Sequence, residues 1–285
     1  MSEFSRRESV RPDARLSRRS LTAAAGILAV LGLGAASKAV AFSKSKPTKI
    51  KWEGGDPSHW HDGKYDCPKK CAICFVRGTR LMTPSGEVAI EDLKTGDVLV
   101  TESGAVRPIR WIGRMLFERG EAGAWADEVR PVRVARDALG AGIPHRDLYV
   151  SRAHMVHLNG LLVPVGDLIN GRTITYADVD TDRLEYFHVE FETHDVVVAE
   201  GAPCESLRLA PRHLASFDNH EEYVALFGQP FHQVAACAPT ASFSGGRSEF
   251  KSRLRSAIAP VIDIRQPMDI VRDELEVRAF RAKVA

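Results

Sequence analysis

The chain has 285 residues, of which 44% are hydrophobic and 27% charged, so it can form a buried core and wholesale disorder is excluded. Its net charge is +2, and the first 41 residues alone carry six Arg, one Lys and three acidic residues, a net +4. The remaining 244 residues are therefore close to −2, so no surface for nucleic acid is indicated. Five cysteines are too few for a disulfide scaffold of this size.

The first 41 residues have the order of an export signal. Arginines precede the apolar run 21–36, and small residues follow it at Ala39 and Ala41. The stretch 17–22, SRRSLT, resembles a twin-arginine signal. We therefore expect the twin-arginine export machinery as a partner and a periplasmic or extracellular location. The alternative is an uncleaved signal that tethers the chain to a membrane, although the 16 apolar residues fall short of the roughly 20 that a bilayer span prefers.

A change of composition separates residues 42–73 from residues 74–206. The first segment is rich in Lys, Gly and Pro and keeps no periodicity, so we interpret it as a linker or pro-segment. In the second, short apolar runs alternate with turn sequences such as PSG at Pro84 and TGD at Thr95, which predicts an all-β domain. The run 187–192, FHVEFE, alternates strictly and predicts a half-buried strand with a polar side toward solvent.

Residues 207–285 are predicted to be a mostly helical extension. Asn219 is a candidate cap for a helix over 220–227, and the segments 248–258 and 268–282 show helical spacing with many charges. The expected fold class is thus all-β with a small helical tail at the C-terminus.

The segment that begins at Cys74 carries the most specific pattern, a thiol at the head of a strand followed by Gly-Thr and two tight turns. It resembles the Hint domain, the fold shared by inteins and by the autoprocessing part of hedgehog proteins, in its bacterial form. The residues that carry this resemblance are Cys74, Phe75, Gly78, Thr79, Pro84, Gly86, Asp92, Leu93, Gly96 and Asp97. Two later motifs follow in the family's order: Ser151-x-x-His154, and the run 185–201 with His188 where many inteins have Asp. The resemblance covers residues 74–206.

This resemblance implies a pseudo-twofold β horseshoe that brings its first and last strands together, and it implies self-cleavage. In the family mechanism the Cys74 thiol attacks the carbonyl of Ile73, so that the acyl group moves from nitrogen to sulfur and a thioester forms. An unassisted peptide bond resists such attack because it is resonance-stabilised. Cysteine suits the task because a thiolate is reachable near neutral pH and leaves readily.

The resemblance also suggests roles for four other residues. His154 is expected to protonate the departing amide nitrogen, a task worth about 10² to 10⁴ in rate. Ser151 is expected to hold a backbone group or the oxyanion. His188 is the expected second acid or base, and His194 is a weaker candidate for the same work. The substrate is the chain's own N-terminal segment, water or an unknown nucleophile resolves the thioester, and no cofactor is expected.

One departure from the family changes the expected outcome. Inteins end in a His-Asn pair, and cyclisation of that Asn severs the downstream junction. This chain has Glu205-Ser206 there, followed by Leu207. We therefore expect cleavage between Ile73 and Cys74 without full splicing.

A rival hypothesis rests on the spacing of Cys67, Cys71 and Cys74. Together with His59 and His61 these thiols could enclose Zn²⁺, or Cys67 and Cys71 could form a disulfide. The same spacing occurs in radical iron–sulfur enzymes, but no βαβ alternation follows it. An exported module with such a structural site would not cleave itself.

Plainer interpretations also exist for the individual residues. Cys74 could be a small buried hydrophobic residue, His154 a satisfied core histidine, and His188 a solvated residue on the polar side of its strand. Cys204 and Cys237 are expected to be structural. A Hint-like fold could also persist without the reaction, because a fold does not by itself guarantee a function.

Overall fold

The computed structural model describes residues 72–120, 123, 125–209, 211–228, 234–243 and 246–282, which all belong to one compact unit, 54–285. The predicted export signal, the predicted linker up to residue 71, and Cys67 and Cys71 lie outside the described residues. Within the described part of the chain, no helix has the length and apolar character needed to cross a membrane.

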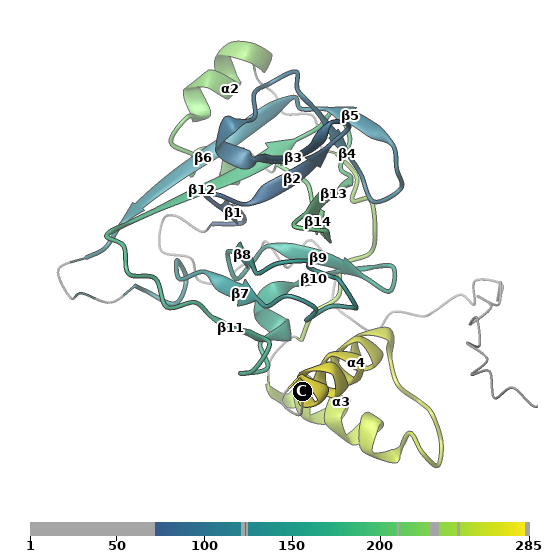
Figure 1. The fold of residues 1–285 in the computed structure, drawn as a ribbon. Coiled ribbons are helices and arrows are strands. Elements are labelled where there is room, and N and C mark those ends of the chain that lie inside the picture. Colours follow the sequence, from purple (N-terminus) through teal and green to yellow (C-terminus); the bar gives the residue numbers. More distant parts are fainter. Residues whose placement is uncertain are drawn as a thin grey trace, which may run out of the picture. The chain divides into compact units, whose positions relative to one another are not determined.

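Six strands form the first sheet, in the order β11-β7-β8-β1-β12-β6 (Figure 1). They are β1 (Phe75–Val76), β6 (Trp111–Glu118), β7 (Val132–Val134), β8 (Leu148–Val150), β11 (Ile174–Tyr176) and β12 (Arg183–Glu190). β12 and β6 pair antiparallel over eight residues, from Arg183↔Glu118 to Glu190↔Trp111. The short β1 lies between β8 and β12, with Phe75 opposite both Val150 and Phe187. The start of the domain is therefore held between two strands that come much later in the chain.

The second sheet also has six strands, in the order β10-β9-β14-β13-β2-β3. They are β2 (Arg80–Thr83), β3 (Gly86–Ala89), β9 (Met155–Leu158), β10 (Leu161–Pro164), β13 (Val196–Ala199) and β14 (Ala202–Glu205). A small third sheet pairs β4 (Val98–Val100) with β5 (Val106–Pro108), and short 3-10 helices occupy Ile90–Asp92 and Val165–Leu168. Each large sheet takes strands from both ends of the domain. The predicted all-β class is confirmed.

Strand β12 corrects one expectation from the alternating pattern. Phe187 and Val189 are buried as predicted, but His188 and Glu190 on the other side are buried too, at 0% and 4% exposure. Core residues cover both sides, because Phe187 and Val189 belong to one apolar cluster and Tyr186 to a second. The polar side of this strand therefore faces protein rather than solvent, and His188 is not a solvated residue.

The helices lie in the C-terminal part, as predicted. They are α1 (Pro211–Leu214), α2 (His220–Phe227), α3 (Gly246–Ile258) and α4 (Pro267–Arg281). α4 joins the β core through Met268, Val271 and Leu275. Asn219 occupies the N-cap position of α2, but its side chain does not cap the helix.

Asn219 instead attaches α2 to strand β6. Its Oδ1 accepts a hydrogen bond from Arg114 N at 2.8 Å, and its Nδ2 donates to Ile112 O at 2.9 Å. β6 is the last strand of its sheet, so these bonds pair backbone groups that the sheet leaves open.

Candidate functional site

Cys74 lies immediately before β1, and two hydrogen bonds join it to Ser151 just after β8. Cys74 N donates to Ser151 Oγ at 2.8 Å, and Ser151 N donates to Cys74 O at 2.9 Å. Both residues are buried. Ser151 therefore holds the backbone on the downstream side of the Ile73–Cys74 bond, which is one of the two roles that the sequence suggested for it.

The thiol of Cys74 is a free, fully buried group. Its Sγ lies 3.9 Å from Met115 Sδ. Burial raises the pKa of the Cys74 thiol far above its usual range; the backbone of Ile73 opposes this shift, and the charge of Glu205 adds to it. The expectation of a thiolate reachable near neutral pH is therefore wrong for this structure. The group that would attack is a protonated thiol that must give up its proton as it reacts.

His154 and His188 meet at Phe75, the residue that follows Cys74. Their ring centroids are 4.9 Å apart, and they lie 4.2 Å and 5.9 Å from the Phe75 ring. His154 precedes β9, and His188 comes from the middle of β12, one position from the partner of Phe75. Pairing of β1 with β12 on one side and with β8 on the other thus brings together two histidines that are distant from Cys74 in sequence.

Both rings are neutral at physiological pH. Burial lowers the pKa of His154 well below its usual value, and the neighbouring His188 lowers it further. Burial likewise lowers the pKa of His188 to about 3. Protonating either ring would place a charge among apolar side chains, and that cost dominates.

The backbone of Ile73 contacts all three reactive groups. It raises the pKa of both histidines and lowers that of the Cys74 thiol. A backbone group that favours an imidazolium is an acceptor, hence the carbonyl, and one that favours a thiolate is a donor, hence the N–H. Neither nitrogen of His154 has a hydrogen-bond partner of good geometry among the described residues, so the approach of this ring to the carbonyl is loose.

One hydrogen bond decides which nitrogen of His188 carries the proton. Its Nε2 lies 3.3 Å from the carbonyl oxygen of Glu205, which can only accept. In the neutral ring Nε2 is therefore protonated and Nδ1 carries the lone pair. Within the described part of the chain Nδ1 has no partner. His188 presents a free proton acceptor in a buried site.

Glu205 is a buried residue of the site that the sequence did not assign a role. Its Oε1 accepts a hydrogen bond from Met155 N at 3.0 Å, and its Oε2 lies 3.8 Å from His194 Nε2. Burial raises the pKa of Glu205 to about 8 and lowers that of His194 to about 4. The two side chains lie at ion-pair distance, but we infer a neutral pair, since burial penalises both charged forms. The signal in the sequence was a carboxylate at the end of the otherwise apolar strand β14, APCE.

His194 lies one step farther from the Ile73–Cys74 bond. Its Nδ1 accepts a hydrogen bond from Cys237 N at 3.1 Å, and a charge on its ring would lower the pKa of His188 further. His194 thus contacts Glu205, whereas Ser151, His154 and His188 lie at the bond itself.

The remaining cysteines and possible metal ligands lie apart from these groups. Cys204 is buried and Cys237 exposed, and both thiols are free. Glu87, His145 and Glu200 are the described side chains whose arrangement could hold a metal ion. Arg146 already pairs with both carboxylates there, at 2.8 Å and 2.6 Å. These residues therefore form a charge-compensated cluster rather than an open ligand set.

Comparison with known proteins finds one family match, over just under half of the chain. Residues 73–211 match the family model of the Hint domain. The MchDnaB-1 intein is 15% identical, with 47% of this chain and 99% of the intein covered and a TM-score of 0.33. A bacterial intein-like domain from Clostridium thermocellum is 15% identical, with 47% and 98% covered and a TM-score of 0.33. The gp41-1 intein is 11% identical, with 46% and 96% covered and a TM-score of 0.34. No curated protein matches the chain.

Proposed function

We propose that this chain, whose residues 73–211 match the family model of the Hint domain, is a self-processing protein that cleaves its own peptide bond between Ile73 and Cys74. The observation that supports this most is the packing of two neutral, buried imidazoles, His154 and His188, against each other and against Phe75, the residue that follows the buried Cys74. Residues 74, 154 and 188 are far apart in sequence, and no packing requirement alone calls for two buried histidines with unpartnered nitrogens beside a peptide bond.

The first step forms a bond between Cys74 Sγ and the carbonyl carbon of Ile73 and breaks the bond from that carbon to Cys74 N. One proton moves from sulfur to nitrogen, so the site gains no net charge. His188 Nδ1 accepts the thiol proton and passes it to His154, which delivers it to the departing nitrogen. Both rings are then neutral again. A buried, neutral pair of imidazoles suits this reaction, because neither ring has to hold a charge in the resting site.

Ser151 positions this reaction. Its hydroxyl and its N–H hold both backbone groups of Cys74, so the thiol and the leaving nitrogen keep their geometry relative to the Ile73 carbonyl. Water or another nucleophile then attacks the thioester carbon and releases the thiol. The products are a fragment that ends at Ile73 and a domain that begins with Cys74. A glutamate at position 205 has no side-chain amide that could cyclise, so splicing does not follow.

The test is the intact mass of the full chain with and without dithiothreitol or hydroxylamine. If the thioester forms, either reagent releases a fragment that ends at Ile73, and hydroxylamine leaves that fragment as its hydroxamate. Cys74→Ala abolishes the release, whereas Cys204→Ala, a second buried free cysteine, keeps it. A wild-type chain that stays intact with both reagents contradicts the proposal.

Export of the chain through the twin-arginine machinery remains part of this proposal. In that case cleavage would separate the Hint domain from a short segment or from a membrane-bound signal. Sequencing the N-terminus of the mature protein distinguishes the steps: Phe42 indicates removal of the signal alone, and Cys74 indicates self-cleavage. The rival metal site is not favoured, because residues 73–211 match the Hint domain and Cys74, one of its expected ligands, is buried among apolar side chains.

A further inference from the structure

Helix α3 turns its polar side toward the rest of the protein and its apolar side toward solvent. Ser252, on the inner side, has 0% exposure. Phe250, Leu254 and Ile258 follow one another at four-residue spacing and are 69%, 54% and 40% exposed. A helix that packs on a core normally shows the opposite arrangement.

Polar contacts with α4 hold α3 in this orientation. Arg255 donates to both oxygens of the buried Asp269, at 2.6 Å and 2.9 Å. Arg272 of α4 donates to Ser256 Oγ at 2.7 Å and also to Ser252 Oγ. Two-point contacts between guanidinium and carboxylate have a defined geometry, so they fix the rotation of α3 about its axis. The apolar side therefore cannot turn inward without breaking a buried polar network.

The apolar side continues past the end of the helix. Val261, Ile262 and Ile264 in the connection to α4 are all exposed, Val261 at 85%. We call the six residues Phe250, Leu254, Ile258, Val261, Ile262 and Ile264 the α3 stripe. So many large apolar side chains on one exposed segment indicate a surface that binds another molecule or a membrane.

Charge distinguishes the two sides of the helix pair. α3 carries Arg247, Lys251, Arg253 and Arg255 against one acid, Glu249, a net charge of +3. Arg247 and Lys251 are exposed and precede Phe250 and Leu254 by three positions, so they lie along the stripe.

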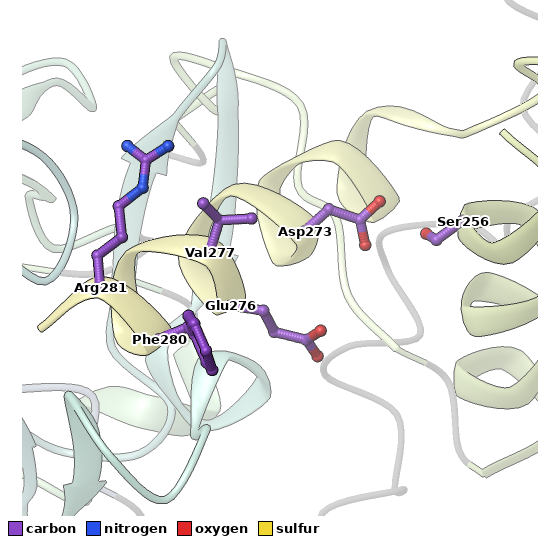
Figure 2. A pocket seen from close by; sticks show the side chains of 6 residues that line it. All are labelled: Ser256, Asp273, Glu276, Val277, Phe280 and Arg281. Carbon is purple, nitrogen blue, oxygen red and sulfur yellow. The ribbon is translucent and has the colours of Figure 1, made fainter. Parts of the chain in front are cut away.

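The exposed apolar residues of α4 have a different setting. Val277 and Phe280 line a hollow of about 400 Å³ together with Ser256, Asp273, Glu276 and Arg281 (Figure 2). Two carboxylates against one guanidinium give this hollow no excess of positive charge, so it suits an anionic surface less well than α3 does. The exposed positive charge of the helix pair is thus concentrated on α3, where Arg247 and Lys251 lie along the stripe.

We propose that the α3 stripe docks on an anionic lipid surface. A helix with an apolar side flanked by Lys and Arg lies in a membrane interface with its apolar side chains among the acyl chains. Arg247 and Lys251 have long stems that can reach lipid phosphates while Phe250 and Leu254 insert. The α3 stripe thus supplies the hydrophobic contact, and the basic residues of α3 supply the preference for negative charge.

The experiment uses the full chain with Cys74→Ala, so that no cleavage intervenes, and follows hydrogen exchange of residues 246–266. The probes are vesicles of phosphatidylcholine alone and of an equal mixture with phosphatidylglycerol. This local measurement is independent of any binding by the N-terminal apolar run. We expect protection of 246–266 with the anionic vesicles only. Phe250→Ser combined with Leu254→Ser weakens binding at least about tenfold, and Arg247→Gln or Lys251→Gln about fivefold each.

Phe280→Ser is the matched control, because Phe280 is 62% exposed but lies on the hollow of α4, which has no excess of positive charge. It leaves the protection unchanged. Thermal unfolding of each variant verifies that these exposed substitutions leave the fold intact. Equal protection by both kinds of vesicle, or by neither, overturns the proposal. Protection of 246–266 that rises with protein concentration in the absence of vesicles also overturns it, because a second copy of the chain then covers the α3 stripe.

Discussion

Replacing Ser151 with alanine removes one hydrogen bond at the centre of the proposed reaction. The buried N–H of Cys74 loses its acceptor, Ser151 Oγ at 2.8 Å, while the bond from Ser151 N to Cys74 O remains. An unpaired buried donor costs about 1–3 kcal/mol of unfolding free energy. A domain of this size then loses about 2–4 °C of melting temperature per kcal/mol. We expect the larger effect on the reaction, since a shift of about 1 Å between reacting groups can slow it about 10²-fold.

Ser206→Ala separates positioning from stability. Ser206 is equally buried, and its Oγ accepts one backbone hydrogen bond, from Asp195 N at 2.9 Å. Both variants should therefore lose similar stability in thermal unfolding. The assay is the rate of dithiothreitol-induced release of the fragment ending at Ile73, measured by intact mass at a temperature where both variants are folded. Only Ser151→Ala should slow it. Equal slowing by both, or an unaffected Ser151→Ala, refutes the positioning role.

Three further predictions concern pH and packing. Because the pKa of His188 is about 3, the rate of fragment release should not fall as pH drops from 7.5 to about 5.5, provided that the concentration of the thiolate form of dithiothreitol is held constant. A decline centred near the ordinary histidine pKa contradicts a neutral buried base. Burial raises the pKa of Glu205 to about 8, so the folded chain binds this proton more tightly than the unfolded chain and its stability falls as pH rises toward 8. Glu205→Gln should therefore reduce the change of the denaturant midpoint between pH 6.5 and 8.5; an unchanged dependence on pH assigns the effect to another group. Gly113→Ala should lower the free energy of unfolding by about 1–3 kcal/mol, because the new Cβ would lie 2.5 Å from the Phe217 ring. Gly120→Ala, whose Cβ meets open space, is the control, and equal denaturant midpoints for the two variants refute the close contact.

Local patterns were sufficient for the class of the fold. Short alternating runs and turn residues predict strands because both signals lie within a few neighbouring residues. The helices over 248–258 and 268–282 were predicted nearly at their observed bounds, Gly246–Ile258 and Pro267–Arg281, for the same reason. The motif beginning at Cys74, with Ser151 and His154, also identified the residues that meet at the Ile73–Cys74 bond.

Burial in this protein depended on the tertiary structure. The alternation in 187–192 is the same whether one or both sides of the strand are covered, and only the pairing of β12 between β1 and β6 buries His188. The raised pKa of the Cys74 thiol and the place of Glu205 follow from the same enclosure. In α3 the spacing predicts an amphipathic helix, but the network around Asp269 decides that its serines face inward. Periodicity is a property of neighbouring residues, whereas burial and the pKa shifts it causes depend on segments that folding brings from elsewhere in the chain.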